Sequence, residues 1–358
     1  MRRLNITLML ALAAVTPFAA SASAGISVFA TGLNNPRGLK FGPDGNLYVA
    51  EGGIGGTNSN EGCCEQVVPP VGPYTGGATG SRISRIDPNG VRTTAVNNLP
   101  SSQTSPALGN LISGATDVAF IGNTLYILLA GSGCSHGVPQ VPERPNGVLR
   151  VNADGTTDLI ANLSAFQMAF PVAHPNPADF EPDGSWYSMI AVGGNLYALE
   201  PNHGELDKIT PAGHISRVSD ISATQGHIVP SAMTYRGNFF VGNLNTFPVV
   251  PGSSKIYQIT PSGKVSVFAE GLTAILGVVF DAEGRMYVLE TTTLAGNPTP
   301  FTGKVIRVDS VGHQTVIASG LFFPTGMTFG PDGALYVSNV GFGPPPVGLG
   351  EILRITVP

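Results

Sequence analysis

The sequence predicts an all-β protein, a six-bladed β-propeller of four-stranded blades whose N-terminal strand closes the last blade. Charged residues make up 11% of the chain, while glycine and proline number 47 and 30, a composition typical of short strands joined by tight turns. One pattern also recurs six times, an apolar residue followed by an aromatic one just after a glycine-containing turn. The copies are Leu47-Tyr48, Leu125-Tyr126, Leu196-Tyr197, Phe239-Phe240, Met286-Tyr287 and Leu335-Tyr336.

The other strands of each unit can be identified around these copies. In the first unit, residues 38–41, 43–45 and 47–50 indicate an inner strand, a Pro-Asp-Gly turn and a return strand. The last three intervals between copies match the ~40–50 residues of a four-stranded blade, and the longer first two intervals predict insertions. A third strand of alternating apolar residues recurs at 83–86, 148–151, 206–209, 256–259, 305–308 and 352–355.

The two ends of the propeller are expected to pair with each other. The last unit lacks a fourth strand, and an unmatched strand at residues 26–30 lies near the N-terminus. Because a ring of blades must avoid open sheet edges, this strand should complete the last blade.

The N-terminal residues predict export to the periplasm or the extracellular space. Two arginines precede an apolar run at residues 8–20, and small residues follow at 22–24, the pattern of a signal peptide that is removed after Ala24. A membrane anchor is the alternative, but the run is short for a bilayer span and no stop-transfer charges follow it. We therefore expect a signal peptide at 1–24, a propeller at 25–358 and no membrane span in the mature protein.

Charge and cysteine content limit the classes of partner. The net charge is −5 and the basic residues are scattered singly, so nucleic acid is not an expected partner. An oxidising compartment favours one disulfide, joining Cys134 to Cys63 or Cys64, with three free thiols as the alternative. Zinc-site spacings of cysteine and histidine are absent from the sequence.

Several segments carry a resemblance to a known family. They are residues 32–51, 75–83, 331–339 and 350–354. In these segments the chain resembles the ScyD/ScyE family of exported propellers, named from a cyanobacterial gene cluster for the pigment scytonemin. Each blade motif is also similar to NHL repeats and to the SMP-30 (gluconolactonase) group. The resemblance implies the fold and export, and it implies no established reaction.

One turn departs from the family pattern. Before the third blade such proteins carry an Asn-Pro-Tyr-like turn, whereas this chain has Asp183-Gly184-Ser185-Trp186-Tyr187-Ser188. If that turn shapes a pocket, we expect a different ligand.

The long loops predict a binding surface on one face of the ring. Propeller geometry brings five of them to the same end, while the short turns lie at the other end. A scaffold that is elaborate on one face presents its binding surface there. The loops span residues 52–79, 131–146, 244–254, 291–302 and 340–349. We call this end the looped face.

Five oxygen-bearing side chains end the second strands at the looped face and are the predicted binding residues. They are Glu51, Glu200, Asn243, Glu290 and Asn339. Such oxygens suit calcium, and gluconolactonase-like propellers, which the chain resembles, hold a metal in the central channel. The first four are therefore candidate calcium ligands. The alternative is that each side chain only hydrogen-bonds the backbone of a nearby loop.

Two histidines are candidate catalytic residues. His203 follows Glu200, and His227 leads into the fourth inner strand, so both are expected near one mouth of the ring. A histidine beside a carboxylate can act as a general base, although a loop histidine is more often only solvated. The Gly-x-Ser-x-Gly nucleophile elbow is absent from the sequence.

Two functions follow as hypotheses. The first is an exported binding or accessory protein for a small molecule, glycan or protein, resembling proteins associated with scytonemin-type secondary metabolism. The alternative is a calcium-dependent lactone or ester hydrolase of the SMP-30/gluconolactonase-like type.

Overall fold

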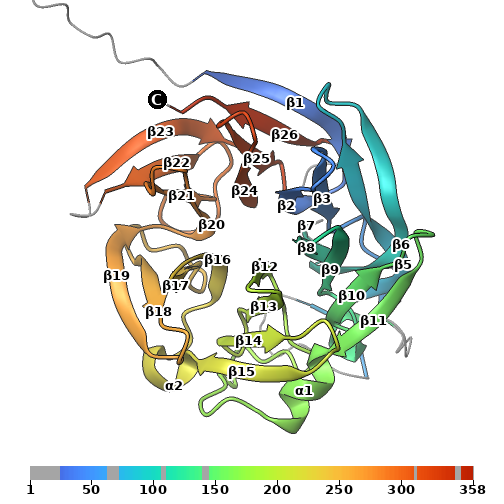
Figure 1. The fold of residues 1–358 in the computed structure, drawn as a ribbon. Coiled ribbons are helices and arrows are strands. Elements are labelled where there is room, and N and C mark those ends of the chain that lie inside the picture. Colours follow the sequence, from blue (N-terminus) through green and yellow to red (C-terminus); the bar gives the residue numbers. More distant parts are fainter. Residues whose placement is uncertain are drawn as a thin grey trace, which may run out of the picture.

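The computed structural model describes residues 25–62, 72–105, 110–138, 145–309, 313–342 and 348–357. Six antiparallel sheets stand around a central axis, and their order around the ring follows the chain (Figure 1). The six-bladed propeller predicted from the repeat is therefore confirmed. The predicted signal peptide lies outside the described residues. None of the helices in the described part of the chain is long and apolar enough to cross a membrane.

Each blade runs outward from an inner strand that borders the axis. Blade 1 contains β2 (Pro36–Phe41), β3 (Leu47–Glu51), β4 (Asn58–Ser59), β5 (Thr75–Ile86), β6 (Arg92–Ser105) and β7 (Asn110–Ser113). Blade 2 contains β8 (Ala115–Ile121), β9 (Thr124–Leu129), β10 (Gly147–Val151) and β11 (Thr157–Asn162). Blade 3 contains β12 (Ser188–Val192), β13 (Asn195–Glu200), β14 (Glu205–Ile209) and β15 (Ile215–Asp220).

The second half of the ring is more regular. Blade 4 contains β16 (Pro230–Arg236), β17 (Asn238–Asn243), β18 (Ser254–Ile259) and β19 (Val265–Leu272). Blade 5 contains β20 (Ile275–Phe280), β21 (Met286–Glu290), β22 (Gly303–Val308) and β23 (Gln314–Leu321). Blade 6 contains β24 (Gly326–Phe329), β25 (Leu335–Asn339), β26 (Gly350–Ile355) and β1 (Ile26–Leu33). Two short helices, α1 (Leu163–Ala169) and α2 (Ser222–Gln225), and the 3₁₀ turn η2 (Cys134–His136) lie in connections.

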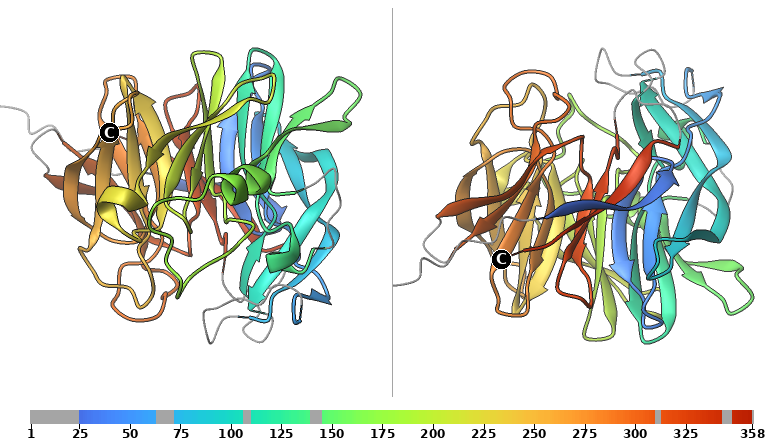
Figure 2. Two further views of the ribbon diagram at one scale, coloured as in Figure 1. Left: turned by 90° about the horizontal axis from the view of Figure 1, so that it is seen from below. Right: turned by 90° about the horizontal axis from the view of Figure 1, so that it is seen from above.

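The N-terminal strand closes the ring as predicted. β1 pairs antiparallel with β26, from Ile26 opposite Ile355 to Leu33 opposite Gly350, and the two strands lie side by side in Figure 2. The backbone N–H of Gly25 adds a hydrogen bond to Thr356 Oγ1 at 2.8 Å. The strand is longer than the predicted 26–30, because its pairing with β26 continues through two register shifts.

The repeated aromatic residue has a packing role that explains its recurrence. In four blades its ring meets, edge to face, an aromatic ring from the inner strand of the next blade. The pairs are Tyr48 with Phe120, Phe240 with Phe280, Tyr287 with Phe329 and Tyr336 with Phe41. The hydrophobic core thus lies between the blades, in clusters that join each blade to the next.

Blade 1 differs most from the expectation. The sequence predicts its third strand at 83–86, but β5 is 12 residues long and its partner β6 is 14 residues long. The insertion pairs again as an extension of the same hairpin, with β4 beside β5 and β7 beside β6. Glycine permits this close approach, since a Cβ on Gly56 would lie 1.9 Å from the carbonyl carbon of Gly76.

Candidate functional site

A pocket of about 530 Å³ lies on the looped face, where the long loops meet the starts of the inner strands. Residues from all six blades or their connecting loops line the pocket, so no single blade forms it. The turn at residues 183–188, which differs from the pattern of the ScyD/ScyE family, contributes Ser185, Trp186 and Tyr187 to the lining of the pocket. The loop lengths predicted a binding surface on this face, and the pocket lies on it.

One side of the pocket is apolar. Leu111, Leu244, Leu276 and Phe342 line it, and they belong to one hydrophobic cluster with Phe323. The rings of Phe323 and Phe342 stack with centroids 4.6 Å apart. Apolar groups of a ligand can be buried against this side.

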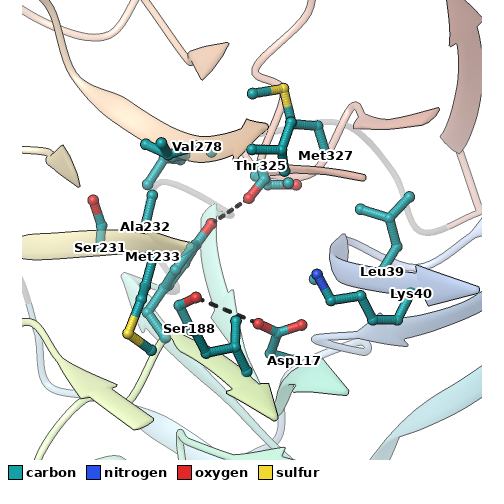
Figure 3. Close-up of a pocket in the computed structure, with 17 residues that line it drawn as sticks. Leu39, Lys40, Asp117, Ser188, Ser231, Ala232, Met233, Val278, Thr325 and Met327 are labelled. Atoms are coloured by element: carbon teal, nitrogen blue, oxygen red, sulfur yellow. Dashed lines mark hydrogen bonds between the residues drawn. The ribbon is translucent and has the colours of Figure 1, made fainter. Parts of the chain in front are cut away.

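Tyr187 separates the pocket from the central channel. Its hydroxyl donates a hydrogen bond to the backbone carbonyl of Thr325 at 2.9 Å, and it lines both the pocket and a small axial cavity of about 40 Å³ (Figure 3). The axial cavity has room for a few water molecules and not for an organic ligand. The accessible site is therefore the pocket on the looped face.

Asp117 is a buried carboxyl group in the axial cavity that the sequence analysis missed. It accepts a hydrogen bond from the backbone N–H of Met189 at 2.8 Å, and Lys40 lines the same cavity (Figure 3). Burial raises the pKa of Asp117 to about 6, and the nearby positive charge of Lys40 opposes that rise. The sequence did carry a signal for this residue, because most units have a small or apolar residue at the equivalent position of the inner strand.

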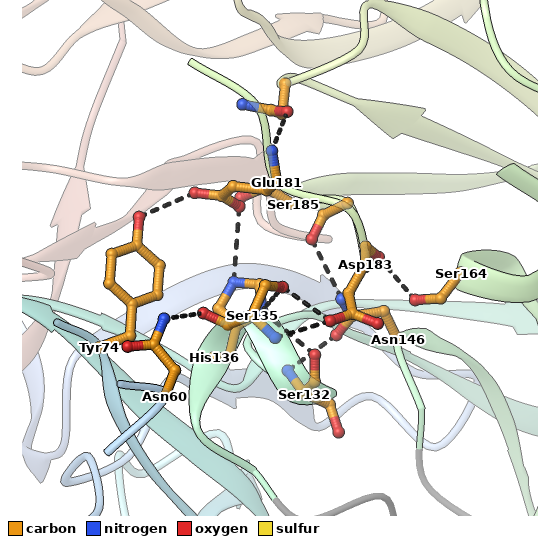
Figure 4. A network of polar contacts seen from close by, with 12 residues as sticks. Asn60, Tyr74, Ser132, Ser135, His136, Asn146, Ser164, Glu181, Asp183 and Ser185 are labelled. Atoms are coloured by element: carbon orange, nitrogen blue, oxygen red, sulfur yellow. Dashed lines mark hydrogen bonds and ion pairs between the residues drawn. The ribbon is translucent and has the colours of Figure 1, made fainter. Parts of the chain in front are cut away.

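Another part of the pocket lining is polar and centres on Glu181. The hydroxyl of Tyr74 donates a hydrogen bond to Glu181 Oε1 at 2.9 Å, and His136 Nε2 lies 3.5 Å from Glu181 Oε2 (Figure 4). Burial, and then the negative charge of Glu181, raises the pKa of Tyr74 well above its usual value, so this hydroxyl keeps its proton. Tyr74 and Glu181 both line the pocket.

The loop that carries Glu181 is held in place by blade 2. Asp183 Oδ2 accepts hydrogen bonds from the backbone N–H and the hydroxyl of Ser135, at 2.8 and 2.7 Å (Figure 4). The carbonyl oxygen of Asp183 accepts from Asn146 Nδ2 at 2.9 Å and from the hydroxyl of Ser164 at 2.5 Å. These buried contacts make the polar wall a preorganised surface.

The two candidate histidines both contact the loop segment 179–181. His227 Nε2 lies 2.9 Å from Asp179 Oδ2, and Asp179 lines the pocket, so this pair is at its edge. His203 Nε2 instead contacts the backbone carbonyl of Glu181 at 3.0 Å, and its ring lies against Phe180. His227 is thus beside a carboxylate that faces the pocket, whereas His203 supports the loop.

The five oxygen-bearing residues at the strand ends make contacts within their own blades. Four of them accept a hydrogen bond from a backbone N–H of the segment entering the blade: Glu51 from Asn34 at 2.6 Å, Glu200 from Ser185 at 2.6 Å, Glu290 from Thr273 at 2.7 Å and Asn339 from Phe322 at 2.9 Å. Asn243 donates to the carbonyl of Ile228 at 3.0 Å. Equivalent positions in the repeat therefore make an equivalent hydrogen bond, to the backbone of the segment that enters the blade.

These contacts correspond to the alternative to a calcium site, in which each side chain hydrogen-bonds the backbone of a nearby loop. Glu51 also pairs with Arg82 at 2.8 Å and Glu290 with Lys304 at 3.1 Å, so cations of the same blade already balance their charge. No group of three or more His, Cys, Asp or Glu in the described ranges could hold a metal ion. The candidate ligands do not fit a shared calcium site, and calcium binding by the chain stays a prediction without a structural site.

The disulfide prediction concerns loops of blades 1 and 2. Cys134 is disulfide-bonded, and its predicted partners, Cys63 and Cys64, lie outside the described residues. Asn60 Nδ2 donates a hydrogen bond to the carbonyl of Ser135 at 2.9 Å, so the flanks of the two loops are in contact.

Comparison with known proteins identifies the architecture. No family model matches the chain, and no curated protein matches it. The structure is similar to a gluconolactonase from Xanthomonas campestris, with a TM-score of 0.56 and 12% identity over 94% of this chain and 90% of that one. It is also similar to a putative glucose dehydrogenase from Thermus thermophilus, with a TM-score of 0.55 and 16% identity over 93% and 100%. A luciferin-regenerating enzyme gives 0.54 and 9% over 93% and 95%.

These neighbours share the fold. Their names cover three different activities, and their identities to this chain are too low to transfer any of them. What this chain shares with them is the six-bladed propeller fold.

Proposed function

We propose that this protein is an exported binding or accessory protein that holds a small organic molecule in the pocket of the looped face. The observation that carries the proposal is the pocket itself, of about 530 Å³, with an apolar side at Leu244 and Leu276 and a polar side at Tyr74 and Glu181. Small-molecule sites commonly occupy about 300–1,000 Å³ and combine an apolar lining with a few placed polar groups. The ligand that suits this pocket has an apolar body and hydrogen-bonding groups at one end.

The polar side is suited to hold such a ligand in one orientation. Glu181 and Asp179 are acceptors, Tyr74 keeps its proton, and Asn202 supports the loop by accepting from the backbone N–H of Glu181 at 2.9 Å. The predicted signal peptide supports export, and the resemblance of the sequence to ScyD/ScyE proteins supports a role in secondary metabolism. A glycan is less suited, because the aliphatic side chains of Leu111, Leu244 and Leu276 offer its hydroxyl groups no hydrogen-bond partners.

Fluorescence titration with the uncharged dye N-phenyl-1-naphthylamine tests the proposal. Ala178 is exposed and lines the pocket, so Ala178→Trp should fill the site without disturbing the core. We expect saturable binding that is at least about tenfold weaker in this variant, since an occupied pocket excludes the dye. Ala153→Trp, at an exposed turn, is the matched control and should bind as wild type. Absence of binding, or equal binding by both variants, would contradict the proposal.

Hydrolysis of a lactone or ester is the second candidate. The gluconolactonase-like neighbours favour it at the level of architecture, and the His227–Asp179 pair beside the pocket is a proton-transfer group. The candidate calcium ligands Glu51 and Glu290 do not support the metal-dependent form, because each is paired within its own blade. A pH-stat assay with δ-valerolactone tests this candidate. Turnover that His227→Gln abolishes would favour it, and no turnover would remove it.

A further inference from the structure

We propose that two uncharged loops beside the pocket dock the protein onto a lipid surface of zwitterionic composition. The loops are residues 244–253, between β17 and β18, and residues 291–302, between β21 and β22. We call them together the apolar rim. Figure 2 shows loops in this part of the chain, coloured orange, projecting from one end of the ring. The inference concerns a surface and its partner, and it does not depend on which molecule the pocket holds.

The apolar rim exposes large hydrophobic side chains to solvent. Phe247 and Val250 are 45% and 59% exposed in the first loop. Leu294 and Phe301 are 52% and 66% exposed in the second. Exposed apolar residues that are grouped in this way mark interaction sites, whereas single ones are ordinary.

The two loops form one surface. Val249 and Gly296 are joined by an antiparallel bridge, in which the N–H of Val249 donates to the Gly296 carbonyl at 2.7 Å and the reverse bond is 3.0 Å. Phe301 packs edge to face on Phe322, with centroids 4.9 Å apart. The loops are thus held by each other and by the core, so the exposed side chains do not fold back onto the protein.

The chemistry of the apolar rim favours a neutral lipid surface as its partner. Residues 244–253 and 291–302 contain no Asp, Glu, Lys, Arg or His, and their remaining residues are Thr, Ser, Asn, Gly, Ala and Pro. Protein interfaces surround their apolar centre with a polar rim that often carries charge. Attachment to anionic lipids needs clusters of Lys or Arg. Phenylalanine and leucine without charge instead suit insertion at the boundary between headgroups and acyl chains.

The position of the apolar rim relative to the pocket adds a second argument. Phe247 is exposed on the rim and also lines the pocket, together with Leu244 and Thr246. The pocket therefore opens beside the docking surface. A lipophilic ligand could pass between the lipid and the apolar side of the pocket with little exposure to water.

Vesicle flotation tests the inference. Wild-type protein that begins at Gly25, after the predicted signal peptide, is mixed with dioleoylphosphatidylcholine vesicles and compared with Leu294→Asp/Phe301→Asp and with Val316→Asp. Val316 is 56% exposed on the outer strand β23, so it is a matched control for adding one charge to an exposed apolar position. We expect wild type and Val316→Asp to float with the vesicles and the rim variant to lose at least about tenfold in affinity, because charge opposes insertion.

Tryptophan fluorescence gives a second readout that does not require the fold to tolerate two added charges. Phe301→Trp should show a blue shift of its emission when vesicles are added, whereas Val316→Trp should not. Trp186 is 1% exposed and supplies a constant background. No flotation and no shift, or flotation only with anionic vesicles, would overturn the inference. Light scattering that shows a dimer of wild type but a monomer of the rim variant would overturn it as well, since the partner would then be a second copy.

Discussion

The hydroxyl of Tyr187 in blade 3 donates to the backbone carbonyl of Thr325 in blade 6, so one hydrogen bond of 2.9 Å joins opposite sides of the ring. This contact closes the channel below the pocket. It also explains why the pocket floor is well defined, because Tyr187 packs in the same cluster as Leu276 and Phe342. The proposed ligand site therefore lies above the axis and not within it.

Two substitutions of Tyr187 should destabilise the ring to different extents. Tyr187→Phe loses one hydrogen bond and should lower the free energy of unfolding by about 1 kcal/mol. Tyr187→Ala also leaves a cavity and should cost about 3 kcal/mol or more. Tyr48→Phe is the control, because its hydroxyl bonds Asp44 in an exposed turn. Urea melts measure all three, and a Tyr187→Ala variant as stable as wild type would show that Tyr187 does not close the channel.

Stability should fall at alkaline pH because of carboxyl groups buried in blade 3. Glu200, Glu205 and Asp207 are each 0% exposed, and Arg217, which pairs with Glu205, supplies one positive charge. Burial raises the pKa of Glu205 and of Asp207. The charges of Asp207 and Glu200 add to the rise at Glu205, the charge of Glu200 adds to the rise at Asp207, and Arg217 opposes both. A raised folded pKa gives stability that is complete below the unfolded value of about 4 and is lost as pH rises through the folded value.

Asp207→Asn tests this expectation. Neither carboxyl oxygen of Asp207 has a hydrogen-bond partner in the part of the chain that the structure describes, so the variant should be more stable than wild type at about pH 9, with a flatter dependence on pH. Glu205→Gln is the comparison, and it should gain less because it leaves Arg217 without its partner. Thermal melts between about pH 5 and pH 9 measure both. Parallel pH curves for Asp207→Asn and wild type would contradict the expectation.

The role of Glu200 can be decided by one substitution. It accepts hydrogen bonds from the backbone N–H groups of Ser185, His203 and Gly204. Glu200→Gln should therefore lower stability by about 1–3 kcal/mol, because a charge-assisted acceptor is lost. The loss should be the same in EDTA and in excess calcium. Glu283→Gln, at an exposed turn, is the control. A loss seen only with calcium would revive the metal hypothesis.

The disulfide should be a large contribution to stability. Pairing of Cys134 with Cys63 or Cys64 closes a loop of about 70 residues, for which the chain-entropy model gives roughly 4 kcal/mol. Cys134→Ser should lower the free energy of unfolding by up to that amount. Non-reducing peptide mapping of protein from the exported fraction should identify the partner, and three free thiols there would contradict the prediction.

The repeat was enough to predict the scaffold. The number of blades and the closing strand follow from the alternation of apolar residues and the recurrent aromatic, since each blade must bury its faces against its neighbours. The same regularity correctly assigned Glu51, Glu200 and Glu290 to equivalent positions at the ends of strands. It left two directions open for these side chains, a metal in the central channel or the backbone of a nearby loop, and the structure shows bonds to the backbone of the segment that enters each blade.

Sequence alone thus determined the propeller, its closure and the face that carries the long loops. Only the tertiary structure decided the site, which brings Tyr74 of blade 1, His136 of blade 2 and Glu181 of the next connection into one network. These residues lie in three insertions, and each insertion could adopt many conformations that bury similar apolar area. Contacts between insertions select among them, and such contacts have no periodicity that a single sequence reveals.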